Sequence, residues 1–132
     1  MHGDLVDALA HETSRADVVF WDPFSPRANP ALWTVAAFTA LRRAAADRCV
    51  VFTYSASTAT RLALLLAGFA VGIGDAIGDK AETTAAAVRA DDLVRPLDRA
   101  WLSRLHRADV PLPPDAPADA VARAVAAPQF CR

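Results

Sequence analysis

Continuous apolar runs alternate along the chain with segments of helical spacing. Four runs predict strands: ADVVFWD at 16–22, CVVFTY at 49–54, FAVGI at 69–73 and ETTAAAV at 82–88. The first run suits a strand that is buried on both faces, as in a parallel sheet. The turn GDAIGDK joins the last two runs and makes them an antiparallel hairpin. The order of elements therefore predicts the α/β class, with a sheet that ends in a hairpin.

The segments between these runs carry apolar residues at helical spacing. Pro30 suits the first turn of a helix, and an apolar stripe continues from it to about residue 46. The hydroxyl-rich stretch SAST can cap the next helix, and Gly68 is placed to end that helix. A further helix is expected near the N-terminus, where Asp4 can serve as its cap.

The tail has a different character from the rest of the chain. It contains one helical segment near residues 97–108, then a proline-rich linker and a last short helix in ADAVARAVAA. We therefore divide the chain into a sheet-forming part, residues 1–90, and a helical, proline-containing extension, residues 91–132.

Composition indicates a single globular domain in the cytoplasm. Hydrophobic residues make up 54% and charged residues 22% of the 132 residues, which is typical of a folded protein. The net charge is −1, and no basic stripe is visible that would mark a nucleic-acid surface. The N-terminus does not resemble a signal peptide, and no apolar stretch is long enough to cross a bilayer.

Cysteine and histidine spacing does not indicate a metal site. Cys49 and Cys131 are far apart in the sequence, and His2, His11 and His106 form no metal-ligand pattern. We expect two ordinary thiols in a reducing compartment and no bound metal.

The junction after the first strand is unusual. Residues 21–33 read WDPFSPRANPALW, with an aspartate, three prolines and three large aromatic residues where a connection is ordinarily short and polar. Prolines stiffen such a segment, so its geometry is set before a ligand binds. These features favour a ligand-binding segment over a simple loop.

This junction resembles the signature Asp-Gly-Phe-x-Pro-x-x-Asn-Pro-x-x-Trp-Thr of one class I methyltransferase family. The family is the S-adenosylmethionine-dependent methyltransferase domain of the bifunctional bacterial enzyme that makes 5-methylaminomethyl-2-thiouridine in tRNA. Pro23 replaces the glycine of the signature. The residues that match in order and spacing are Asp22, Phe24, Pro26, Asn29, Pro30, Trp33 and Thr34.

Two later stretches, FTYSASTATRLALLLAGFAV and GDKAETTAA, are similar to the same family and extend the resemblance from residue 3 to about residue 88. The resemblance implies an N-methyltransferase that acts on the 5-aminomethyl group of a tRNA wobble uridine. It also implies S-adenosyl-L-methionine as cofactor and tRNA as partner.

The cofactor site implied by the resemblance is incomplete in this sequence. Such methyltransferases bind the cofactor with a glycine-rich turn after one strand and an acidic residue after the next, and neither feature is present in the expected place. The resemblance puts Asp4 near the turn that reaches the adenine, and its alternative role is a helix cap. We expect the chain alone to bind the cofactor weakly or not at all.

The implied reaction needs a neutral, aligned amine, and an alkylamine has a pKa of roughly 10 in solution. Asp22, at the carboxyl end of a predicted parallel strand, is placed to hold an N–H and orient the lone pair. Phe24 and Trp33 are predicted to stack on a base or cover the amine. Asn29 and Tyr54 complete the predicted substrate-binding residues.

Structural roles compete with these predictions. Asp22 can cap the following helix, and Trp33 can pack in the core. Asn29 can be a turn residue before proline, and Tyr54 can make structural hydrogen bonds. Lys80 is best interpreted as a solvated lysine in the hairpin turn.

Class I methyltransferases have the strand order 3-2-1-4-5-7-6, so the resemblance implies a partial sheet of order 4-5-7-6 that lacks the first three strands. Its apolar first strand would be an open edge, which invites pairing unless something covers it. Self-association, a partner chain or the tail can provide that cover.

Three functions therefore stay open. The first is the N-methyltransferase, or a fragment of it, and the second is a noncatalytic remnant that serves as a binding or assembly module. The third is a fragment of a DNA or RNA methylase that acts on exocyclic amines, because DPF resembles the Asp-Pro-Pro-Tyr type of motif in those enzymes.

Overall fold

The strands form one mixed sheet in the order β1-β2-β4-β3. The computed structural model describes residues 16–21, 30–74, 82–107 and 109–131. The strands are β1 (Ala16–Phe20), β2 (Ala45–Thr53), β3 (Ala70–Gly74) and β4 (Thr83–Ala87). β1 runs parallel to β2, whereas β4 runs antiparallel to both β2 and β3. The α/β class and the closing hairpin are confirmed, and the numbering of these strands within a larger sheet stays a prediction.

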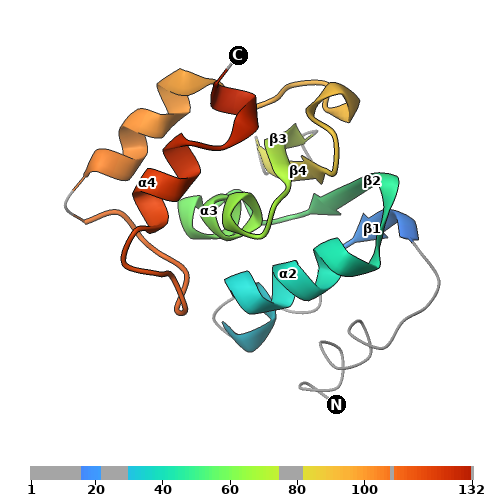
Figure 1. Ribbon diagram of the computed structural model, residues 1–132, viewed down its shortest axis with the longest axis horizontal. Helices are drawn as coiled ribbons and strands as arrows, with labels where there is room; N and C mark the ends of the chain where they lie inside the picture. The colour runs from blue at the N-terminus through green and yellow to red at the C-terminus, as the bar shows by residue number, and fades with distance from the viewer. Residues whose placement is uncertain (1–15, 22–29, 75–81, 108, 132) are drawn as a thin grey trace.

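The helices are short and lie side by side. In Figure 1, α2, α3, α4 and the orange helix η3 follow one another across the molecule, and each contacts the next, with α4 between α3 and η3. The α-helices are α2 (Val35–Ala44), α3 (Thr58–Leu66) and α4 (Ala120–Val125). The 3-10 helices are η1 (Pro30–Trp33), η2 (Ala90–Asp92), η3 (Arg99–His106) and η4 (Pro128–Phe130).

One face of the sheet forms the floor of the hydrophobic core. Val51 of β2 pairs with Val19 on one side and with Ala86 on the other, and Ala86 pairs with Val71. The side chains of Val51, Ala86 and Val71 are buried together with Phe38 of α2 and with the leucines of α3. Full burial of a large apolar side chain stabilises the fold by about 1.5–3 kcal/mol, so this face is the main source of stability.

The opposite face is exposed at β1 and β2. Phe20 and Phe52 are register partners and stack with ring centroids 5.7 Å apart. Val18 is 57% and Phe20 is 77% exposed. The expectation that the first strand is buried on both faces is therefore wrong, because the described part of the chain places no layer over these side chains.

The two edges of the sheet differ. Along β3, the N–H of Ile73 donates to the carbonyl of Arg95 (2.9 Å), and the N–H of Leu97 donates to the carbonyl of Val71 (2.9 Å). The side-chain amide of Gln129 accepts from the N–H of Val71 (2.7 Å) and donates to its carbonyl (2.9 Å). The extension thus closes the β3 edge, whereas β1 is the other, terminal strand of the sheet.

The extension and the sheet share one hydrophobic core. Buried extension residues that belong to it are Leu97, Trp101, Leu102, Leu105, Ala124 and Phe130. The carboxylate of Asp115 also accepts hydrogen bonds from the N–H groups of Val35 (2.9 Å) and Ala36 (3.0 Å) at the start of α2. The compositional boundary near residue 90 therefore does not separate two cores.

Some expected elements differ from those observed. The helix expected from Pro30 to about residue 46 is wrong as a single unit, because Thr34 is extended and accepts a hydrogen bond from the N–H of Ala37 (3.1 Å), which starts a new helix. The next strand begins at Ala45 rather than at 49, directly after that helix. The expected tail helix is a 3-10 helix, capped by Asp98.

Other local predictions are confirmed. In the stretch SAST, the hydroxyl of Ser57 accepts from the N–H of Thr60 (3.1 Å) and caps α3. Gly68 follows that helix with a positive φ of 103°, a conformation that side chains disfavour. The last short helix lies within the predicted segment.

Replacing Gly72 by alanine is expected to lower the free energy of unfolding by about 1–3 kcal/mol. A methyl group there would lie 2.6 Å from the carbonyl oxygen of Arg95 and 3.2 Å from the Cα of Pro96. These are backbone atoms, which cannot move aside as easily as the end of a flexible side chain. Urea unfolding measures the loss. The matched control is Ala70→Ser, which also adds one heavy atom to β3 but next to a cavity; equal losses would contradict the close packing of the extension.

Candidate functional site

The carboxyl ends of β1, β2 and β3 meet at one edge of the sheet. Phe20 pairs with Phe52 near the ends of their strands, Thr53 pairs with Thr84, and Gly74 pairs with Thr83. The start of α3 follows β2 at the same place. We call this region the carboxyl edge, and in open α/β sheets it is where ligands bind.

Trp21 anchors the chain at the carboxyl edge. Its N–H donates to the carbonyl of Phe52 (2.8 Å), and its carbonyl accepts from the hydroxyl of Thr53 (2.6 Å). The buried indole N–H donates to the carbonyl of Leu32 in η1 (3.1 Å), and the ring packs against Phe38 with centroids 5.6 Å apart. Because Trp21 precedes residues 22–29 and Leu32 follows them, one side chain ties together both ends of the segment that carries the sequence signature.

Four predicted site residues lie outside the described residues. These are Asp4, Asp22, Phe24 and Asn29, and Lys80 lies outside them too. Asp22 directly follows the anchored Trp21. The roles of all four side chains stay predictions.

The two other predicted site residues have different environments. Trp33 is 5% exposed and meets Phe38 edge to face, with centroids 6.3 Å apart. Core packing thus accounts for the position of Trp33. Tyr54 follows β2 at the carboxyl edge and is 45% exposed, so it is accessible to a ligand. The neighbouring Ser55 shares a hydrogen bond with the hydroxyl of Thr60 (3.1 Å) within the helix cap.

Arg61 is a buried charge at the carboxyl edge that the sequence does not reveal. Its side chain is 1% exposed; Nε donates to the hydroxyl of Thr84 (3.0 Å), and Nη2 donates to the carbonyl of Thr83 (3.0 Å) and to a carboxylate oxygen of Glu82 (3.1 Å). Burial lowers the pKa of Arg61, and the bond to Glu82 opposes that effect. Arg61 links α3 to the start of β4. Its position inside the apolar stretch TRLALLL is the one sequence signal that its side chain is buried.

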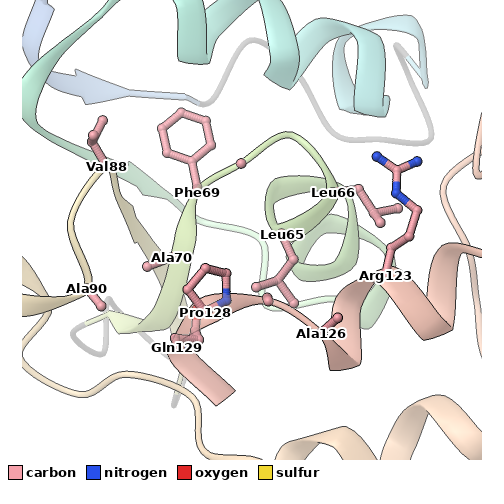
Figure 2. Close-up of a pocket in the computed structure, with 12 residues that line it drawn as sticks. Leu65, Leu66, Phe69, Ala70, Val88, Ala90, Arg123, Ala126, Pro128 and Gln129 are labelled. Atoms are coloured by element: carbon pink, nitrogen blue, oxygen red, sulfur yellow. The ribbon is translucent and has the colours of Figure 1, made fainter. Parts of the chain in front are cut away.

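A cavity of about 330 Å³ lies at the opposite ends of the strands. Figure 2 shows side chains from α3, from the start of β3 and from the C-terminal segment around it. Its walls include Leu66 and Phe69, and the amide of Gln129 is already bonded to Val71 and to Leu97. Arg123 is the charged residue among those that line the cavity. The cavity therefore offers few groups that could recognise a polar substrate.

The described helices do not include one that is long and apolar enough to cross a membrane. Among the described residues, His, Cys, Asp and Glu form no group of three that could hold a metal ion.

The mixed sheet with its anchored carboxyl edge defines a Rossmann-like α/β protein. The model of a family described as S-adenosyl-L-methionine-dependent methyltransferase matches residues 1–89, and the chain therefore belongs to this family. The family resemblance expected from the sequence is confirmed.

Relatives and a solved structure agree with this assignment. The tRNA 5-methylaminomethyl-2-thiouridine biosynthesis bifunctional protein MnmC of Ectopseudomonas mendocina is 34% identical over 104 residues, which are 79% of this chain and 16% of the relative. The protein of the same name from Ralstonia nicotianae is 33% identical over 87% of this chain and 16% of its own length. The crystal structure of MnmC2 from Aquifex aeolicus aligns with a TM-score of 0.69 at 26% identity, over 91% of this chain and 41% of that one. The chain thus spans about a sixth of the length of these curated relatives.

The family implies S-adenosyl-L-methionine, but two hollows that the described residues line at the carboxyl edge do not suit its sulfonium group. These hollows include Arg61, Arg104 and Arg107, and guanidinium groups repel a sulfonium cation. The carboxylate of Glu82 is already bonded to Arg61. Asp4, the predicted cofactor contact, lies outside the described residues, and its role stays a prediction.

Replacing Thr53 by valine is expected to lower the free energy of unfolding by about 1–2 kcal/mol, because the buried carbonyl of Trp21 loses a hydrogen bond. Chemical denaturation followed by tryptophan fluorescence measures the change. The matched control is Thr39→Val, which removes a hydroxyl bonded to the carbonyl of Val35 on a half-buried helix face and should cost less. A smaller loss for Thr53→Val than for the control would contradict the anchoring role.

Proposed function

We propose that this chain forms the acceptor side of an N-methyltransferase that methylates the 5-aminomethyl group of a tRNA wobble uridine, with S-adenosyl-L-methionine as methyl donor. The observation that carries the proposal is the anchoring of Trp21, which ties both ends of the signature segment to the carboxyl edge. The family match and the names of the relatives supply the reaction type and the substrate class.

In this proposal Asp22 is the catalytic residue. Its carboxylate accepts a hydrogen bond from the acceptor amine, directs the nitrogen lone pair away from itself and takes up a proton as the nitrogen becomes alkylated. A neutral amine is required, and a solution pKa of roughly 10 makes most of it protonated at neutral pH. Asp22 therefore acts on the neutral fraction of the amine and stays ionised, so that it can accept the single proton that the nitrogen releases on alkylation.

The remaining predicted residues bind and position the substrate. Phe24 stacks on the uracil ring. Trp33, which is buried beside Phe38, holds η1 against the core. Asn29 and Tyr54 line the acceptor pocket, and Tyr54 has the exposure that this role requires. Asp4 contacts the adenine side of the cofactor.

A second candidate function is a noncatalytic binding or assembly module. The exposed apolar side chains of Val18, Phe20 and Phe52 favour it, because a large exposed apolar patch often marks a protein interface. In addition, β1 is a terminal strand, and such a strand can pair with another chain. A second copy of this chain or a different partner could cover that face.

Replacing Asp22 by asparagine or alanine in the intact enzyme is expected to slow methylation of the aminomethyl nitrogen by about 100-fold or more. The measurement is mass analysis of the modified uridine after incubation with tRNA and the methyl donor. Asp47→Asn, a change at an exposed carboxylate at the other end of β2, is the control. Unchanged methylation in the alanine variant would remove Asp22 from the mechanism.

Calorimetric titration of the purified chain with S-adenosyl-L-methionine is expected to show weak binding or none, since the sequence lacks the glycine-rich turn and the described arginines disfavour a cation. Titration with S-adenosyl-L-homocysteine, which lacks the positive charge, separates repulsion by the arginines from the lack of the turn. Tighter binding of this compound would indicate repulsion, and equally weak binding would indicate the lack of the turn. Tight binding of the methyl donor at low micromolar concentration would show that this chain holds a complete cofactor site.

A further inference from the structure

Positive charge is concentrated in the first part of the extension. The segment Arg95–Arg107 carries four arginines and one aspartate, although the chain as a whole has a net charge of −1. That aspartate, Asp98, caps η3, because its carboxylate accepts hydrogen bonds from the N–H groups of Ala100 (3.0 Å) and Trp101 (3.3 Å). The sequence alone does not indicate where this charge lies relative to the site.

The fold brings this charge to the carboxyl edge. Arg104 lines two hollows, of about 290 Å³ and 300 Å³. The first is shared with Arg61 and Glu82 beside the start of β4, and the second with Thr58, the first residue of α3, and with Arg107. Arg61 and Arg104 line the same hollow. Burial is the main cause of the lowered pKa of Arg61, and the charge of Arg104 lowers it slightly further.

Two of these arginines are available to a ligand. Arg104 and Arg107 are exposed and form no ion pair with any other described residue. Arg95, by contrast, donates to the carbonyl of Gly74 (2.7 Å), and Arg99 donates to the carbonyl of Phe130 (2.7 Å). Asp109 also lines the second hollow, so the surface is not uniformly positive and a ligand must place its charge near the arginines.

We propose that Arg104 and Arg107 form a docking surface for the phosphate backbone of an RNA strand, which crosses the two hollows at the carboxyl edge. Guanidinium groups bind phosphate oxygens in a bidentate manner and are well suited to this role. The choice of RNA rests on the proposed function. An anionic membrane is less suitable as a ligand, because the apolar residues Trp101, Leu102 and Leu105 of η3 are buried in the core and unavailable for insertion.

Binding of a fluorescently labelled tRNA to the full chain, followed by anisotropy over a range of salt concentrations, tests the proposal. Wild type should bind more weakly as salt rises, and Arg104→Ala combined with Arg107→Ala should reduce the slope of log K against log salt by about 1.5, the loss of roughly two phosphate contacts. The control removes two exposed arginines from the opposite ends of the strands, Arg89→Ala with Arg123→Ala, and should keep the wild-type slope. Replacing both Arg104 and Arg107 by lysine should restore most of the affinity.

The assay contains no methyl donor, and its tRNA carries no aminomethyl group. A failure of methyl transfer therefore leaves its result unaffected, and circular dichroism verifies that each variant is folded. The proposal is overturned if wild type does not bind tRNA at low salt, or if the alanine pair binds with the wild-type slope. Loss of binding to phosphatidylserine vesicles with unchanged binding to tRNA would identify the surface as membrane-directed and overturn it as well.

Discussion

Burial of a single face of the sheet is the constraint on which the rest of the structure depends. The row that runs from Val19 through Val51 and Ala86 to Val71 lies beneath α2 and α3. Once these helices occupy that face, the chain must cross the carboxyl edge between each strand and the helix that follows. Trp21, which precedes residues 22–29, and Tyr54 therefore lie at the same edge because the core holds β1 and β2 side by side.

The same constraint leaves the molecule asymmetric. At β3 the extension supplies backbone and amide partners, and Gly72 leaves room for the main chain of Arg95. At β1 the outer face keeps Phe20 and Phe52 in water. The covered edge is thus the one built by this chain's own tail, and the exposed apolar face is the one at β1 and β2.

The sequence was sufficient for features that depend on local chemistry. Apolar runs located the strands, the hydroxyls of SAST located the cap of α3, and Gly68 located its end. It was insufficient where distant parts meet. An apolar run does not distinguish one covered face from two, so the exposure of Phe20 was missed. The burial of Arg61 was not predicted, because its partners lie more than twenty positions away in the sequence. The arginines of the tail did not form a recognisable stripe until folding placed two of them at the carboxyl edge.

The carboxylate of Asp115 reaches back 80 positions along the chain to hold the first amides of α2, the helix that directly follows the signature segment and η1. The family match ends at residue 89, so the end of that match is not a border of the folded unit. A shortened version that ends there would leave those amides without this partner and remove a large part of the shared core. The tail therefore belongs to the minimal unit that should be expressed, exchanged between homologues or fused to another protein.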